Sequence, residues 1–200
     1  MEHPLSYRDG LDGDTPRGVV IVEGVSDRHA IEALAERHGR DLGAERIAVS
    51  PIGGAQAIDR FLVRLRSERP HVRLAGLCDV GEEAHFRRAL ERAGLGIGLS
   101  RAGMEKLGFY VCEADLEDEL IRALGTAAVE RVVEAEGELA SFRRFQDQPA
   151  QRGRDPHAQL RRFLGTRAGR KVRYGALLVD ALELDRVPRA LDRVLDHVRG

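Results

Sequence analysis

Acidic side chains stand at the ends of three short apolar runs in this sequence. Glu23, Asp79 and Glu113 each come directly after such a run. Helix capping explains Glu23 and Asp79 poorly, because they follow strand-like runs rather than opening a helical turn. Carboxylates brought together repel one another and need a counter-charge, and hard divalent cations such as Mg²⁺ take oxygen ligands of this kind. The pattern indicates a divalent-metal site suited to phosphoryl chemistry.

Further carboxylates come a few residues later, where helical patterns begin. Acidic residues in a first helical turn also cap orphan N–H groups and complement the helix dipole. Capping and metal binding therefore both remain open at these positions. They are Asp27, Glu82, Glu83, Asp115, Glu117 and Asp118.

The elements that must position these side chains follow a strand–helix rhythm. Short apolar runs at 19–22, 47–49, 72–78 and 109–112 predict four strands. Helical patterns follow them at 26–39, from about 56, at 82–93 and at 115–124. This alternation predicts an α/β fold, a mostly parallel, four-stranded, Rossmann-like sheet flanked by helices. Ligands of such sheets bind beyond the carboxyl ends of the strands, so we expect the carboxylates to share one edge.

Three regions are predicted along the chain. Residues 1–17 are polar and rich in Gly, Asp and Pro, which predicts a flexible N-terminal arm. Residues 18–125 form the α/β domain, with a loop or one short helix at 94–108. Residues 126–200 are expected to pack on this domain as a helical C-terminal extension. Its expected helices are 127–140, 156–164, 172–183 and 188–198.

Composition excludes several classes of protein. Lys and Arg number 32 against 33 Asp and Glu, so the chain is no bulk polycation. Aromatic residues make up 4% and Trp is absent, which argues against a stacking platform for single strands. The sequence shows no secretory signal, and no apolar stretch approaches the roughly 20 residues of a membrane span. Cys78 and Cys112 each end an apolar run, which predicts buried free thiols and a reducing, cytoplasmic location.

Two of these strand ends resemble the motifs of a Toprim domain, the metal-binding α/β module of topoisomerases, primases and several nucleases. The run 20–27 (VIVEGVSD) resembles the first motif, and 77–79 (LCD) with the turn after it resembles the second. The Glu-Gly-x-x-Asp spacing, the 51–55 segment (PIGGA) and 115–117 (DLE) are most similar to the nucleases of the OLD family. This Toprim-like resemblance covers about 18–125 and extends loosely to 169–174 (GRKVRY), where OLD-type nucleases place a catalytic Lys ahead of a helix.

The resemblance implies a set of site residues and their roles. Glu23 would also handle protons, and Lys171 would stabilise charge on the phosphate in the transition state. One or two Mg²⁺ or Mn²⁺ ions are implied, and two ions about 4 Å apart would clamp the attacking and leaving oxygens. The implied metal ligands are Glu23, Asp27, Asp79, Asp115 and Glu117.

The sequence departs from the family pattern in two ways. Gly81 stands where the second Asp of the Asp-x-Asp motif is expected, and Glu82 or Glu83 would have to substitute for it. If neither does, one metal site is weakened. The chain also lacks a G-x-x-x-x-G-K-[ST] phosphate loop, so the sequence predicts a stand-alone Toprim protein whose ATP-driven control, if any, comes from a separate ATPase.

The stretch 152–173 is the most basic part of the chain. It either tracks a nucleic-acid backbone or forms a solvated helix face. Lys171 also stands out because the chain has only one other lysine, Lys106. The predicted nucleic-acid-binding residues are Arg161, Arg162, Arg170 and Arg173.

These features favour a metal-dependent nuclease that hydrolyses DNA phosphodiester bonds by a two-metal mechanism. One alternative is an RNA-processing ribonuclease, although Gly81 argues mildly against it. Another is a binding module that is non-catalytic or holds a single metal and partners a separate ATPase or nucleic-acid complex. A count of two cations per chain favours hydrolysis, and one or none favours the module. The sequence leaves the oligomeric state open.

Overall fold

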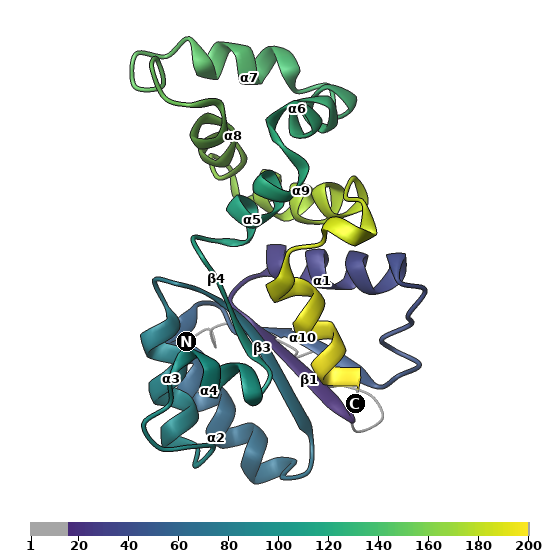
Figure 1. Ribbon diagram of the computed structural model, residues 1–200, viewed down its shortest axis with the longest axis vertical. Coiled ribbons are helices and arrows are strands. Elements are labelled where there is room, and N and C mark those ends of the chain that lie inside the picture. Colours follow the sequence, from purple (N-terminus) through teal and green to yellow (C-terminus); the bar gives the residue numbers. More distant parts are fainter. Residues whose placement is uncertain (1–15, 200) are drawn as a thin grey trace, which may run out of the picture.

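The computed structural model describes residues 16–199, so all but the last two residues of the predicted arm lie outside it. Its centre is a four-stranded sheet of order β2-β1-β3-β4, in which every pairing is parallel (Figure 1). The predicted α/β fold is thereby confirmed. The strands are β1 (Gly18–Val22), β2 (Ile47–Pro51), β3 (Arg73–Asp79) and β4 (Phe109–Cys112).

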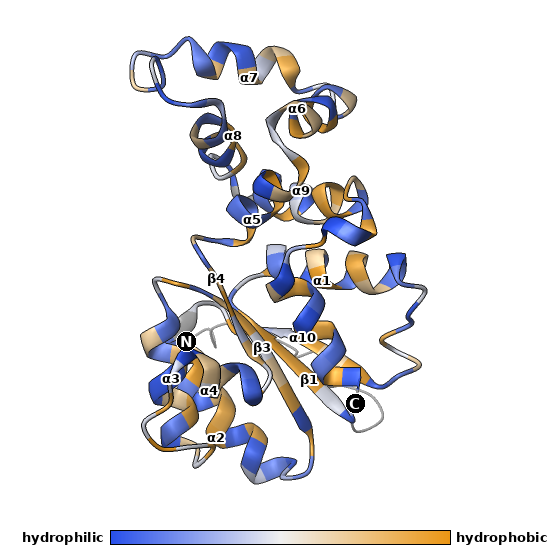
Figure 2. Cartoon of the chain, in the orientation of Figure 1, coloured by the Kyte–Doolittle hydropathy of each residue, from blue (hydrophilic) through white to orange (hydrophobic). Residues whose placement is uncertain are grey.

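Helices cover both faces of this sheet. Val19 and Ile21 of β1 pack on one side with α2, α3 and α4, while Val20 and Val22 pack on the other side with α1 and α10. Both faces of β1 are apolar because it is a central strand buried on each side (Figure 2). The sheet helices are α1 (Val25–Arg37), α2 (Ile58–Glu68, after a short turn of helix η1 at Ala55–Ala57), α3 (Glu83–Arg92), α4 (Arg101–Lys106) and α10 (Arg189–Arg199).

The remaining helices form a lobe beyond the carboxyl ends of the strands (Figure 1). Its core includes Phe142, Phe145 and Phe163. The ring centroid of Phe163 lies 5.1 Å from that of Phe142 and 5.6 Å from that of Phe145. The lobe is continuous with the α1 side of the sheet through one apolar cluster. Its helices are α5 (Leu116–Leu124), α6 (Thr126–Ala135), α7 (Leu139–Gln146), α8 (Pro156–Leu164) and α9 (Ala168–Asp180), with η2 (Leu184–Arg186) leading back to α10.

Two of the expected helices differ from the prediction. The helix expected at 127–140 is two helices, α6 and α7, because Gly137 takes a left-handed conformation with φ 70° between them. The helix expected at 172–183 begins four residues earlier, at Ala168. Lys171 therefore lies in the first turn of α9 rather than ahead of it. In the 94–108 segment the structure has one short helix, α4.

Helix α9 crosses from the lobe to pack along α1. The two backbones come so close that a Cβ on Gly175 would lie 2.8 Å from the carbonyl oxygen of Ser26. This contact holds the middle of α9 against the beginning of α1. It thereby carries Lys171 to the edge of the sheet where the carboxylates lie.

Candidate metal centre

Glu23 and Asp79 meet at the ends of neighbouring strands. The Asp79 backbone N–H donates a hydrogen bond to Glu23 Oε1 at 3.0 Å. The N–H groups of Gly53 and Gly54 donate to the backbone carbonyl of Glu23, each at 3.1 Å. Both glycines have positive φ, which lets the turn after β2 aim two N–H groups at one oxygen. The ends of β1, β2 and β3 are thus tied together around Glu23.

Asp27 caps helix α1 from the same edge. The Gly24 N–H donates to Asp27 Oδ2 at 2.8 Å, across the turn that joins Glu23 to the helix. This bond uses one of the two carboxylate oxygens of Asp27. Capping and metal binding are therefore compatible at this position.

Helix α5 supplies two more carboxylates. Asp115 caps the helix by accepting a hydrogen bond from the Asp118 N–H on Oδ1 at 2.8 Å. Glu117 is only 4% exposed, and its Oε2 lies 3.2 Å from Lys171 Nζ of α9. Its other oxygen, Oε1, is buried and has no hydrogen-bond partner among the described residues.

Burial and mutual repulsion raise the pKa of Glu23, Asp27, Asp79 and Glu117. Burial raises the pKa of Asp79 to about 8, with further contributions from Glu23 and Asp27. Burial is also the main reason that the pKa of each of Glu23, Asp27 and Glu117 lies above its ordinary value. The carboxylates lack enough positive charge to hold them all ionised.

Lys171 is the cation that faces several of them. Burial alone would lower its pKa, but Glu117, with Asp27 and Asp115, raises it above its ordinary value. The Lys171 side chain stays 41% exposed, so its ammonium group remains accessible from solvent. It can both pair with Glu117 and reach a bound anion.

These residues fit a hard divalent cation by their chemistry. Within residues 16–199 no three Asp, Glu, His or Cys side chains already stand in a metal-holding arrangement. However, Glu117 Oε1 is a buried acceptor without a donor, and the raised carboxyl pKa values mark a site short of positive charge. Oxygen donors of this kind are the ligands that Mg²⁺ and Mn²⁺ prefer. Side-chain rotation must complete the coordination.

Gly81, which stands where the family pattern has an Asp, has empty space beside it. A Cβ on Gly81 would meet nothing within 4 Å. Glu83 turns away to pair with Arg101, whose Nε lies 3.1 Å from Glu83 Oε2. Glu82 lies beside His85, whose Nδ1 is 2.8 Å from Glu82 Oε2, and its charge also contributes to the raised pKa of Glu23. Both candidate substitutes thus contact a basic side chain, and the substitution of Glu82 or Glu83 for the missing Asp stays a prediction.

The four arginines predicted to bind nucleic acid do not form one surface. Arg161 lies beside the centre, and its Nε is 2.8 Å from Asp115 Oδ2. Arg162 is exposed on α8, and Arg173 is exposed but pairs with Glu136 and Glu138 of the lobe.

Arg170, the fourth of these arginines, is buried. Its guanidinium stacks 4.0 Å above the ring of Phe163 and donates to the carbonyl of Phe163 and to Glu138. The start of α9 needs this anchor because it lacks a capping side chain. These contacts give Arg170 a structural role, and its binding of nucleic acid stays a prediction.

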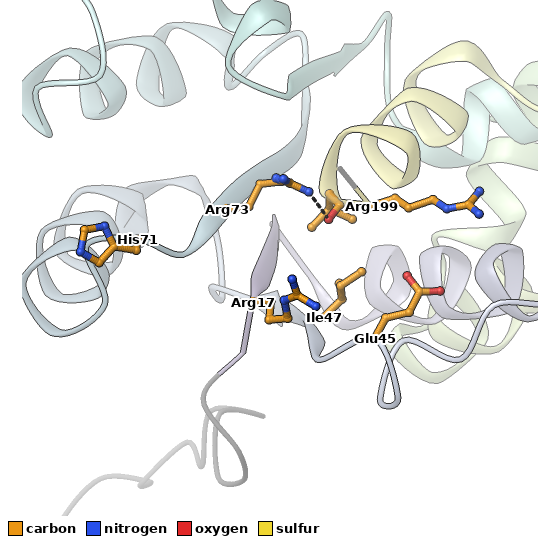
Figure 3. Close-up of a pocket in the computed structure, with 7 residues that line it drawn as sticks. Arg17, Glu45, Ile47, His71, Arg73 and Arg199 are labelled. Atoms are coloured by element: carbon orange, nitrogen blue, oxygen red, sulfur yellow. Dashed lines mark hydrogen bonds between the residues drawn. The ribbon is translucent and has the colours of Figure 1, made fainter.

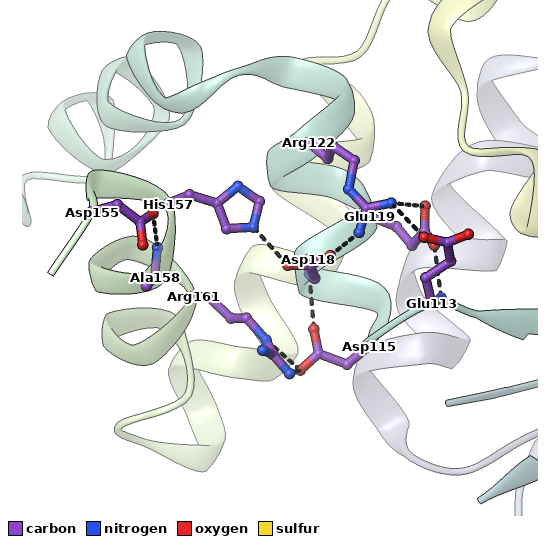
Figure 4. Close-up of polar contacts among 9 residues, drawn as sticks. All are labelled: Glu113, Asp115, Asp118, Glu119, Arg122, Asp155, His157, Ala158 and Arg161. Atoms are coloured by element: carbon purple, nitrogen blue, oxygen red, sulfur yellow. Dashed lines mark hydrogen bonds and ion pairs between the residues drawn. The ribbon is translucent and has the colours of Figure 1, made fainter. Parts of the chain in front are cut away.

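The sequence does not predict two contacts between α5 and α8. His157 Nε2 lies 2.7 Å from Asp118 Oδ1, and Arg161 pairs with Asp115 one helical turn further along α8 (Figure 4). The partners are 39 and 46 residues apart in the chain. The acidic residues at 115–118 indicate a helix cap, but they do not indicate which basic residues would contact them.

A separate cavity lies at the opposite edge of the sheet, where the strands begin. It has a volume of about 750 Å³ and is lined by residues that include Arg17, Glu45, Arg73 and Arg199 (Figure 3). Among its lining residues Glu45 is the only carboxylate, and Arg40 already pairs with it at 2.6 Å. This cavity offers no cation site.

Part of this chain is similar to a known domain family. Residues 16–79 match the family model described as the overcoming lysogenization defect protein-like Toprim domain. Toprim domains generally bind divalent metals. This part of the chain therefore resembles the Toprim domain of the OLD-like proteins.

The similar solved structures extend this likeness over almost the whole chain. The C-terminal region of the Xanthomonas campestris pv. campestris OLD protein matches with a TM-score of 0.69 and 24% identity, covering 94% of this chain and 96% of that one. The C-terminal region of the Burkholderia pseudomallei OLD protein matches with a TM-score of 0.64 and 22% identity, covering 92% and 97%. The helical lobe is thus part of the shared fold. No curated protein matches the sequence.

Two further sequence predictions concern the cysteines and the membrane. Cys78 and Cys112 are buried and free, as the sequence predicts. Among the helices of residues 16–199, none combines the length and apolar character needed to cross a bilayer.

Proposed function

We propose that this protein is a divalent-metal-dependent nuclease that hydrolyses phosphodiester bonds of DNA at the acidic edge of its sheet. The observation that carries the proposal is the convergence of Glu23, Asp27, Asp79 and Glu117 around a single accessible lysine. Such a site is short of positive charge until cations bind. The likeness of the chain to OLD proteins supports the same reaction class.

Each residue then has a role set by its position. Mg²⁺ or Mn²⁺ ions held by Glu23, Asp27, Asp79, Asp115 and Glu117 would supply Lewis acidity and an activated water. Glu23, with a raised pKa, is suited to take up a proton at the strand edge. Lys171 places its Nζ where charge develops on the phosphate as the P–O bond breaks. Its pair with Glu117 holds it there before substrate arrives.

A non-catalytic or single-metal module is the second candidate function. Gly81 favours it, because a glycine supplies no carboxylate where the family pattern has an Asp ligand. No other group of the described residues fills the space beside Gly81. In this case the chain would partner a separate ATPase or nucleic-acid complex. Cleavage of RNA instead of DNA is the third outcome that an assay must test.

The proposal is tested by incubating supercoiled plasmid, single-stranded DNA and structured RNA with the protein in Mg²⁺, Mn²⁺ or EDTA. We expect metal-dependent cleavage of DNA and a loss of at least about 10²-fold in rate for Asp79→Asn, the scale of removing one charge-stabilising group. The matched control is Asp196→Asn, since Asp196 is exposed on α10 away from the acidic edge. Cleavage that persists in Asp79→Asn, or no cleavage in any metal, would contradict the proposal, and cleavage of RNA alone would reassign the substrate.

A further inference from the structure

Asp115 is the one implied metal ligand whose two oxygens are both taken by protein groups. Oδ1 accepts the Asp118 N–H at 2.8 Å as the cap of α5. Oδ2 pairs with Arg161, with Nε at 2.8 Å and a terminal guanidinium nitrogen at 2.7 Å. The oxygen that a cation would need is therefore occupied by a guanidinium (Figure 4).

A basic groove begins at this ion pair. It has a volume of about 360 Å³ and is lined by residues of α8 and its ends together with Asp115. Three guanidinium groups and one carboxylate supply the charge on its walls, so the groove suits an anion. Its lining residues are Asp115, Arg154, Ala158, Arg161, Arg162 and Gly165.

We infer that Arg161 is an exchangeable counter-ion: it neutralises Asp115 until a divalent cation binds, and then turns into the groove to bind a backbone phosphate next to the scissile one. The inference rests on the proposed function and deepens it. It assigns the α8 groove to a phosphate of the nucleic acid. It also makes metal binding and DNA binding depend on each other through one side chain.

The exchange is physically reasonable because the pair is only partly buried. The Arg161 side chain is 42% exposed, and pairs of this exposure hold their partners weakly. A cation on Asp115 Oδ2 would repel the guanidinium, while a phosphate offers it two oxygens in a matching geometry. Asp115 stays in place during the exchange, because its Oδ1 remains bonded to the Asp118 N–H.

Two possible roles of Arg161 predict opposite changes in metal affinity when its side chain is removed. If Arg161 only positioned Asp115 for the metal, its removal would weaken metal binding. If Arg161 competes for Oδ2, its removal strengthens metal binding in the absence of DNA. By linkage, DNA that engages Arg161 also tightens metal binding, and metal tightens DNA binding by the same factor.

The first experiment titrates Mn²⁺ into the metal-free chain, with free Mn²⁺ followed by electron paramagnetic resonance. We expect Arg161→Ala to bind Mn²⁺ about two- to fivefold more tightly than the unmodified protein, the affinity equivalent of an exposed ion pair. Arg162→Ala removes the same charge from the next position of α8 without a contact to Asp115, and it should have a smaller effect. Equal or weaker Mn²⁺ binding in Arg161→Ala would overturn the inference.

The second experiment measures binding of a fluorescent DNA duplex by anisotropy in EDTA and in Ca²⁺, with the duplex checked on a gel for cleavage. We expect Ca²⁺ to tighten DNA binding by the unmodified protein, and most of that gain to be lost in Arg161→Ala. A gain of the same size in both proteins would overturn the inference.

Failure of the inference can be told apart from failure of the proposed function. If the unmodified protein binds no Mn²⁺, the metal centre and the inference both fall. If it binds Mn²⁺ and cleaves DNA but Arg161→Ala changes neither the Mn²⁺ affinity nor the Ca²⁺ gain, only the inference falls.

Discussion

Asp79 is a candidate metal ligand, and its partly buried carboxyl group also lowers the stability of the metal-free folded protein as the pH rises. It ends a central strand, where burial and the neighbouring Glu23 hold its pKa at about 8. An unfolded chain would release this proton near the ordinary value of about 3.9. Between about pH 4 and pH 8 the metal-free folded protein therefore keeps a proton that the unfolded chain has lost.

The sign of the resulting pH dependence follows from linkage. Because the folded state binds more protons between about pH 4 and pH 8, its stability falls as the pH rises through that window. We expect the melting temperature in EDTA to fall between pH 5.5 and pH 8.5. In Asp79→Asn the fall should be smaller by several degrees, since about 2–4 °C corresponds to 1 kcal/mol at this chain length. Parallel profiles for the two proteins in differential scanning calorimetry would contradict the assignment.

The proposed role of Lys171 is to stabilise charge on the phosphate in addition to the metal ions. We expect Lys171→Met to lower the cleavage rate at saturating Mn²⁺ by about 10²–10³-fold, because a charge-stabilising group near the phosphate is lost. The variant should still bind Mn²⁺, since Glu117 and the strand-end carboxylates remain. Lys106→Met on α4 is the matched control for the only other lysine. An unchanged rate in Lys171→Met would show that this lysine is only a partner of Glu117.

At the level of elements, the site depends on how closely α9 approaches α1. Gly175 stands one helical turn after Lys171, against the backbone of Ser26 at the start of α1. Any side chain at Gly175 must push the two helices apart. The distance between Lys171 and the carboxylates would change with it.

Gly175→Ala tests this dependence. We expect a loss of about 1–3 kcal/mol in the free energy of unfolding, as for other overpacked contacts, together with a lower cleavage rate. Gly169→Ala, on the same helix, meets nothing within 4 Å and should be neutral or slightly stabilising. Urea unfolding and initial rates measure both effects. A Gly175→Ala protein as stable and active as Gly169→Ala would contradict the close packing.

The elements that the sequence predicts well are those with a strong local signal. The strands and the acidic residues at their ends follow from apolar runs that stop at a carboxylate, as at Glu23 and Asp79. The start of α9 could not be predicted, because 168–171 is small and polar and carries no apolar period. Its first turn is held by Arg170, whose partners Glu138 and Phe163 come from other parts of the lobe.

The charged contacts are the part of the site that the sequence predicts least. The carboxylates reach one edge because the sheet is parallel, which the strand–helix rhythm indicates. The pairing of Arg161 with Asp115 depends on how α8 docks on α5. Local sequence does not determine that docking, since among 32 Lys and Arg side chains many would pair equally well.

At the scale of the whole molecule, α10, the last described helix, packs against a sheet that includes β1, the first strand. Helix α10 packs on β1, β3 and β4, and a Cβ on Gly18 would lie only 2.6 Å from Cγ2 of Val198. Arg40 after α1 also donates to the carbonyl of Leu195 at 2.9 Å. The sheet face opposite α2 and α3 is therefore covered by a segment distant in sequence.

Leu191→Ala measures how much α10 contributes to the fold. Leu191 is fully buried in the cluster that joins α10 to the sheet, so we expect a loss of about 2–5 kcal/mol in the free energy of unfolding. Arg193→Ala, on the exposed face of the same helix, should change stability by less than about 0.5 kcal/mol. Urea titrations of the two variants give the comparison. A loss in Leu191→Ala no larger than that in Arg193→Ala would contradict the packing of α10 described above.

We propose that the acidic edge of the sheet is a two-cation centre for phosphodiester hydrolysis. The number of Mn²⁺ ions bound per chain, measured by titration of the purified metal-free protein, tests it most directly. We expect two ions in the unmodified protein and fewer in Asp79→Asn, with Asp196→Asn unchanged. A single ion, or none, in the unmodified protein would contradict the two-cation centre and favour the binding module.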